Sequence, residues 1–207
     1  PNVFAIESLI DDLAARVGED PVAYRLSILS EPRARRLIEL VAERANWAQR
    51  GPAGTGKGLG LAFARYKNRA AYAAVVAAVT VQETVKVDRV WCVADAGLVV
   101  NPDGARNQLE GGIVQAVSWT LKEQVKLDAE GIASRDWESY PILRFSEVPE
   151  MQVEFVDGAG NGTLGVGECT VGPTAAAIGN AVKHALGVRI HDMPLTRERI
   201  MAALLKA

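Results

Sequence analysis

Three strand-like segments in the middle of the chain limit the folds that it can adopt. Residues 59–66, 71–82 and 85–93 carry β-branched and aromatic residues at the spacing expected of strands. Helical patterns flank this block, over residues 2–17, 21–29 and 31–47 before it and 104–125, 174–186 and 196–205 after it, and a further strand is expected near 151–157. The order predicts the α+β class, with helices segregated around a mainly antiparallel sheet.

The first predicted helices are expected to pack through their apolar residues. In the first helix the expected inward face is broad and apolar, comprising Phe4, Ile6, Leu9, Ile10, Leu13 and Val17. In the helix over residues 31–47 we expect Leu37, Leu40 and Val41 to point inward. The charged side chains of that helix are then expected to form a solvated face.

A glycine-rich stretch, residues 49–58, separates these helices from the strands. We predict a linker here, which divides the chain into a helical N-terminal region, residues 1–50, and an α+β region, residues 51–207. The text from Gly51 to Gly58 nearly matches a phosphate-binding loop. It has Gly58 where a hydroxyl residue is required, however, and a strand rather than a helix follows. We therefore do not expect nucleotide hydrolysis.

Composition excludes several classes of function. The chain has 207 residues, 49% of them hydrophobic, with a net charge of −2, which is typical of globular material and gives no electrostatic footprint for nucleic acid. No apolar run reaches the length of a membrane span. The two cysteines cannot by themselves bind an iron–sulfur cluster or a structural zinc, which usually need four ligands, and the two histidines lack the spacing of a metal site. Because the chain begins at Pro1 with no initiator methionine, we expect it to be a piece of something larger.

Glu168 is the candidate catalytic residue. It lies in Gly165-Val166-Gly167-Glu168-Cys169, shortly before a predicted helix. A carboxylate on a bend of small residues is poorly shielded by its neighbours, so it can enter a cavity formed by other parts of the protein. The alternative is a surface acid in a connecting loop.

A second unusual segment contains Gln108 and the adjacent glycines Gly111 and Gly112 inside a helical pattern. Two helical glycines cost about 1–2 kcal/mol relative to alanines. That cost is tolerated where another backbone or a flat ligand must approach closely. Gln108 and Gln115 are two helical turns apart, so both can present amides to a heterocycle from one face. The alternative is helix–helix packing through the glycines, and the spacing alone identifies no cofactor.

Taken in order, five segments of the chain resemble the large, molybdenum-binding subunit of the xanthine dehydrogenase/aldehyde oxidase family. They are residues 1–8, 90–97, 101–112, 140–145 and 165–168. The nearest branch is the isoquinoline 1-oxidoreductase β-subunit type, often labelled aldehyde dehydrogenase. The resemblance covers essentially the whole chain, as the C-terminal part of a much longer subunit.

This resemblance implies the fold of the C-terminal molybdopterin-binding domain of molybdenum hydroxylases. Such an enzyme oxidises an aldehyde or N-heterocycle at an electron-poor carbon, using oxygen derived from water. It implies that Glu168 is the general base beside the molybdenum. It further implies that the cofactor-binding residues are Gln108, Gly111, Gly112, Gly165, Val166 and Gly167.

The resemblance also implies a set of cofactors and partners. Molybdopterin with molybdenum, in the cytosine dinucleotide form, would be shared with the N-terminal portion of the same subunit, and iron–sulfur clusters would lie on a partner subunit. The pterin holds the metal in this family, so no side chain of this chain is expected to be a metal ligand. The isolated chain is expected to be inactive. Cys169 stands where the family usually has proline. A non-catalytic assembly or interaction domain of the same fold is the alternative.

Overall fold

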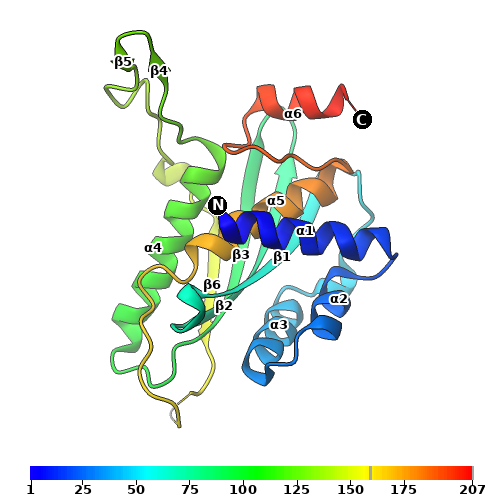
Figure 1. Cartoon of the computed structure of the whole chain (residues 1–207), viewed down its shortest axis with the longest axis vertical. Helices are drawn as coiled ribbons and strands as arrows, with labels where there is room; N and C mark the ends of the chain where they lie inside the picture. The colour runs from blue at the N-terminus through cyan, green and yellow to red at the C-terminus, as the bar shows by residue number, and fades with distance from the viewer. Residues whose placement is uncertain (159, 207) are drawn as a thin grey trace.

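The computed structural model describes residues 1–158 and 160–206, which form a sheet with helices on both of its faces (Figure 1). The strands are β1 Lys57–Arg65, β2 Tyr72–Val81, β3 Val85–Asp95, β4 Leu127–Asp128, β5 Gly131–Ile132 and β6 Glu150–Phe155. The α-helices are α1 Asn2–Arg16, α2 Pro21–Ile28, α3 Pro32–Arg44, α4 Pro102–Leu121, α5 Val171–Leu186 and α6 Arg197–Leu204. Short 3₁₀ helices are η1 Trp47–Gln49, η2 Tyr66–Asn68 and η3 Phe145–Glu147.

The main sheet has the strand order β1-β2-β3-β6. The first three strands pair antiparallel, and β6 pairs parallel with β3 at the edge, from Arg89 opposite Glu150 to Ala94 opposite Phe155. A parallel neighbour needs a crossover connection, and α4 lies within the chain between these two strands. The predicted α+β class with a mainly antiparallel sheet is therefore confirmed, with β6 as the parallel exception.

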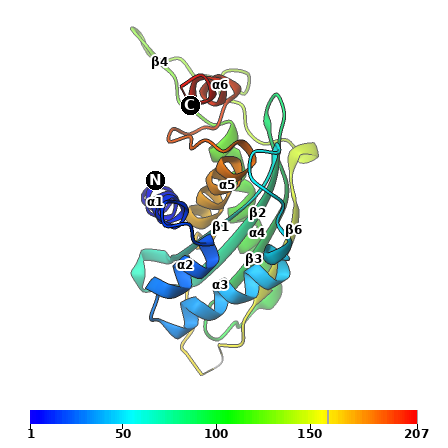
Figure 2. The ribbon, with the colours of Figure 1, turned by 90° about the vertical axis from the view of Figure 1, so that its right-hand side faces the viewer.

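Both faces of the sheet are covered, which makes a three-layer arrangement (Figure 2). Alternate residues of β2, such as Val75 and Ala77, share a core with α4 and α5. Their neighbours Ala74 and Val76 share a second core with α3. A strand that is buried on both faces has a continuous apolar run instead of an alternating pattern. This explains the alanine- and valine-rich sequence of β2.

Glycines in β1 allow α5 to lie almost against the strand. A Cβ atom on Gly58 would lie 2.0 Å from the Ala181 carbonyl oxygen, and one on Gly60 would lie 2.1 Å from the Ala181 amide nitrogen. Both neighbours are backbone atoms of a helix, so they cannot swing away as a flexible side chain could. Gly58, the residue that breaks the phosphate-loop pattern, is thus required for helix–strand packing.

We expect Gly60→Ala to destabilise the fold by about 1–3 kcal/mol, because the added methyl group must push α5 away from β1. Urea denaturation measures the change in the free energy of unfolding. Gly111→Ala is the matched control, since a Cβ on Gly111 meets nothing within 4 Å. Alanine in that exposed helical position is expected to be neutral or stabilising by up to about 1 kcal/mol. Equal effects of the two substitutions would contradict the packing explanation.

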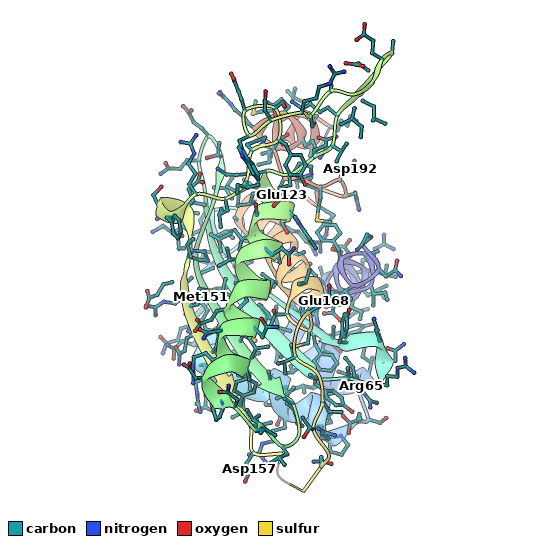
Figure 3. All side chains as sticks on the ribbon, turned by 90° about the vertical axis from the view of Figure 1, so that its left-hand side faces the viewer. Arg65, Glu123, Met151, Asp157, Glu168 and Asp192 are labelled. Atoms are coloured by element: carbon teal, nitrogen blue, oxygen red, sulfur yellow. The ribbon has the colours of Figure 1, made fainter. Side chains whose placement is uncertain are left out.

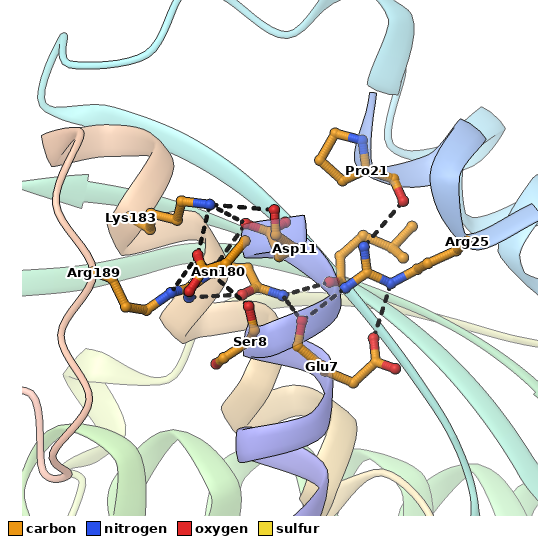
Figure 4. Close-up of polar contacts among 10 residues, drawn as sticks. Glu7, Ser8, Asp11, Pro21, Arg25, Asn180, Lys183 and Arg189 are labelled. Carbon is orange, nitrogen blue, oxygen red and sulfur yellow. Dashed lines mark hydrogen bonds and ion pairs between the residues drawn. The ribbon is translucent and has the colours of Figure 1, made fainter. Parts of the chain in front are cut away.

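The orientation predicted for the first helix is only partly correct. Phe4 is buried as expected, but Ile6 and Leu9 are 57% and 59% exposed, whereas Glu7 and Asp11 point inward and are buried. The inward acids pair with cations from other elements: Glu7 binds Arg25 of α2, and Asp11 binds Lys183 of α5. Arg189 also contacts Asp11 and the backbone oxygen of Ser8 (Figure 4). Because these partners lie far away in the sequence, the local apolar pattern did not reveal which face is buried.

The expectation of a solvated charged face on α3 is also only partly correct. Leu37 and Val41 are buried as expected. Arg33, however, binds both carboxylate oxygens of Asp95 at the end of β3, with distances of 2.6 and 2.7 Å. Arg44 binds Glu154 of β6 in the same two-pronged way. Two of the arginines therefore fasten α3 across the sheet.

Candidate functional site

The loop that carries Glu168 lies across the first half of α4. Thr170, at the end of this loop, is fully buried, and its Oγ1 donates a hydrogen bond of 3.1 Å to the carbonyl oxygen of Leu109. A Cβ on Gly112 would lie 2.4 Å from the same Thr170 Oγ1. Close packing therefore accounts for Gly112, although the neighbour is a loop rather than another helix.

An exposed surface of small residues lies beside this contact. A Cβ on Gly111 or on Gly165 would meet nothing within 4 Å, and one on Gly167 would meet only the Nε2 of Gln108, at 3.7 Å. Gln108 itself is exposed, so its amide is accessible from outside. The structure thus brings Gln108 and the 165–167 segment together, while Gly111 leaves bare backbone on α4.

Glu168 occupies the last part of the loop before α5, on the same side of the molecule as Arg65 at the end of β1 (Figure 3). Its side chain is exposed within this chain. Its backbone is held by the Val171 amide, which donates to the Glu168 carbonyl oxygen at 3.3 Å. The carboxylate is therefore on a defined turn, and any pocket that encloses it must be completed from outside this chain.

Tyr66 contacts this carboxylate and was not anticipated from the sequence. Its phenol hydroxyl donates a hydrogen bond to Oε2 of Glu168. The bond and the nearby negative charge raise the pKa of Tyr66, which keeps the phenol protonated as a donor. The two residues are 102 positions apart. From the sequence, Tyr66 is predicted only to be the last residue of a strand. No local sequence signal joins them.

The cysteines and the inner histidine have structural environments. Cys169 is buried next to Glu168, and burial raises the pKa of its thiol to about 12, so it is a poor nucleophile. Burial also raises the pKa of Cys92. His184 accepts a hydrogen bond of 3.2 Å from the Leu59 amide, and burial lowers the pKa of this histidine. His191 is exposed.

Two features are absent from the described part of the chain. Over residues 1–158 and 160–206, no group of three or more His, Cys, Asp or Glu side chains is arranged to hold a metal ion. Within the same residues, no helix combines the length and the apolar character needed to cross a membrane.

A cavity of about 630 Å³ lies away from the Glu168 loop. It is lined by residues of the β2–β3 turn, the end of α4 and the start of α6, including Lys86, Leu121, Leu143 and Leu195. None of the candidate residues named from the sequence lines it. The candidate site is instead an open surface formed by α4, the 165–170 loop and the β1–β2 turn.

Comparison of the sequence with protein-family models identifies the class of domain to which this fold belongs. A family model described as a molybdopterin cofactor-binding domain matches residues 11–149, well over half of the chain. The chain belongs to this family. The matched region contains Gln108, Gly111 and Gly112 and ends before Glu168.

Individual relatives give the same assignment. The chain is 43% identical to a nicotinate dehydrogenase polypeptide of Pseudomonas putida over 220 residues, which cover 99% of the chain and 18% of that protein. It is also 38% identical to the beta polypeptide of isoquinoline 1-oxidoreductase from Brevundimonas diminuta over 199 residues. These residues cover 93% of the chain and 25% of that protein. The chain thus spans about a fifth to a quarter of the length of these relatives. The resemblance to the molybdenum-binding subunits is confirmed.

The aldehyde oxidoreductase of Desulfovibrio gigas has the same fold. It superimposes with a TM-score of 0.83 at 17% identity, over 99% of this chain and 40% of that chain. At this level of identity the likeness concerns the fold alone. The fold inferred from the family resemblance is therefore confirmed.

Proposed function

We propose that this chain is part of the large subunit of a molybdenum hydroxylase, in which Glu168 is the general base for oxidation of an electron-poor carbon. One observation carries the proposal. The two segments singled out separately in the sequence, around Gln108 and around Glu168, meet on one exposed surface in the structure. Membership of a cofactor-binding family supports this use of the surface.

The residues on this surface fit a pterin cofactor. The Gln108 amide is exposed and offers both a donor and an acceptor to the polar edge of a heterocycle. Gly111, Gly165 and Gly167 present backbone without side chains, so a flat group can approach closely. When bound, the molybdenum cofactor supplies a two-electron redox centre and the water-derived oxygen. We propose that the cytosine dinucleotide form is used and that iron–sulfur clusters on a partner subunit receive the electrons.

In this proposal, a carboxylate oxygen of Glu168 accepts the proton of the hydroxyl group that attacks the electron-poor carbon of the substrate. The carboxylate is exposed in this chain, so water must be excluded by other parts of the subunit. Loss of water makes a carboxylate a stronger base, because burial disfavours its charged form. The isolated chain holds the base in place but does not enclose it, and we expect no turnover from it.

An aromatic N-heterocycle is the proposed substrate class, in preference to an aldehyde. The two relatives at 43% and 38% identity are named for nicotinate and isoquinoline, which are both aromatic N-heterocycles. The test is to coexpress the chain with the rest of its large subunit and the iron–sulfur subunit. Molybdenum content and dye reduction are then measured with nicotinate, isoquinoline and benzaldehyde. Absence of molybdenum from the assembled complex would favour a non-catalytic assembly domain.

We expect Gln108→Leu to reduce the molybdenum content of the assembled enzyme by about tenfold or more, because a buried pterin edge would lose its hydrogen-bond partner. Metal analysis and release of the pterin after denaturation measure this loss. Gln82→Leu is the matched control, since Gln82 is exposed in the β2–β3 turn, outside the candidate site. Equal molybdenum content in the Gln108 variant and the wild type would remove Gln108 from the cofactor site.

A further inference from the structure

We propose that Tyr66 is a positioning residue that holds the Glu168 carboxylate in its reactive orientation. The inference rests on the proposed function of Glu168. It concerns a residue from the β1–β2 turn, which none of the sequence motifs includes. The contact on which it stands is the hydrogen bond from the Tyr66 hydroxyl to Oε2 of Glu168.

The Tyr66 phenol is held by a well-defined turn. The Tyr66 amide donates to the Ala71 carbonyl oxygen at 3.0 Å, and the Tyr66 carbonyl oxygen accepts from the Ala70 amide at 2.9 Å. Two intervening residues, Lys67 and Asn68, have positive φ values of 50° and 57°, which makes the turn tight. The half-buried Tyr66 side chain also packs against the main hydrophobic core. The backbone hydrogen bonds and the packing of the ring therefore hold the Tyr66 hydroxyl group in a defined position.

Glu168 needs such a partner because its own surroundings restrain it weakly. It follows Gly167 in a loop of small residues, and its side chain is exposed. A phenol donor fixes Oε2 and leaves Oε1 to receive a proton. The raised pKa of Tyr66 means that the donor keeps its proton at and above neutral pH.

The experiment is Tyr66→Phe in the assembled holoenzyme, which keeps the ring and removes only the hydroxyl. We expect kcat to fall about tenfold, with KM and molybdenum content unchanged. This selective loss of kcat is the readout, because a merely structural role would change KM or molybdenum content as well.

Tyr140→Phe is the matched control. Tyr140 is also half-buried, and its hydroxyl donates to Oε2 of Glu123 at 2.8 Å, outside the candidate site. Carboxylate hydrogen bonding raises the pKa of Tyr140 as it does that of Tyr66. We expect Tyr140→Phe to leave kcat unchanged. An equal effect of both substitutions would overturn the positioning role.

A double variant separates this inference from the proposed function. Added to Glu168→Gln, Tyr66→Phe should cause no further loss of kcat, because it acts through the carboxylate. If Tyr66→Phe lowers kcat in the Glu168→Gln variant by the same factor as in the wild type, the positioning role is overturned. If Glu168→Gln is inactive but Tyr66→Phe retains the wild-type kcat, Tyr66 is excluded and the Glu168 assignment stands. Full activity of Glu168→Gln would overturn both.

Discussion

Replacing Glu168 by glutamine in the assembled enzyme is expected to lower kcat by about 10²–10⁴-fold, the usual contribution of a general base. Glutamine has nearly the same shape, and its amide oxygen can still accept a hydrogen bond from Tyr66. It cannot accept the proton. Because the side chain is exposed in this chain and Gln108 is unchanged, molybdenum content is expected to equal that of the wild type. Steady-state dye reduction and metal analysis on the same preparation measure both quantities.

Glu123→Gln is the control for this substitution. Glu123 accepts a hydrogen bond from a tyrosine, as Glu168 does, but lies just beyond the end of α4 in a different part of the molecule. We expect the activity of this variant to be that of the wild type. Retention of activity by Glu168→Gln would end the assignment of the base. Joint loss of activity and molybdenum would instead indicate that Glu168 holds the cofactor.

Local sequence patterns were informative where the structure depends on local backbone requirements. The strand block predicted β1, β2 and β3, and the adjacent glycines on α4 marked a place of close approach. The pattern did not separate the two glycines. Gly112 is closed in by Thr170, whereas Gly111 is open. This difference depends on a loop that is distant in the sequence, so only the folded chain distinguishes a packing glycine from one that is free to meet a ligand.

The features that the sequence did not reveal depend on distant partners. The apolar spacing of α1 indicated an inward face, yet Ile6 and Leu9 point outward because Glu7 and Asp11 meet cations from α2 and α5. Tyr66 meets Glu168 only because the β1–β2 turn folds beside the start of α5. Both cases are polar contacts between elements, which hydrophobic periodicity does not record.

The buried ion pair between α1 and α2 leads to the second large expected effect. Arg25 is 1% exposed, and its guanidinium binds the Glu7 carboxylate at 2.9 Å and the carbonyl oxygens of Glu7 and Pro21 at 3.0 Å each. We expect Arg25→Leu to lower the free energy of unfolding by about 3–5 kcal/mol at neutral pH, because it leaves the Glu7 carboxylate buried and unpaired. Urea denaturation measures the loss. Arg16→Leu, on the exposed end of α1, is the control and should change stability by less than about 0.5 kcal/mol.

The pH dependence of this loss distinguishes lost charge pairing from lost packing. Burial raises the pKa of Glu7 above its ordinary value of 4.5, although Arg25 partly offsets the effect. A carboxylate with a raised pKa in the folded state favours folding at low pH, and this contribution is lost as the pH rises through the folded value. Removing Arg25 removes the offset, so the penalty of Arg25→Leu should be greatest at pH 7 and shrink as the pH falls toward 4.5. Combining Glu7→Leu with Arg25→Leu should recover most of the loss at pH 7, since neither charge of this pair then remains to be left unpaired. A penalty that is the same at every pH, and that the double substitution does not relieve, would mean that Arg25 stabilises α1 and α2 through packing alone.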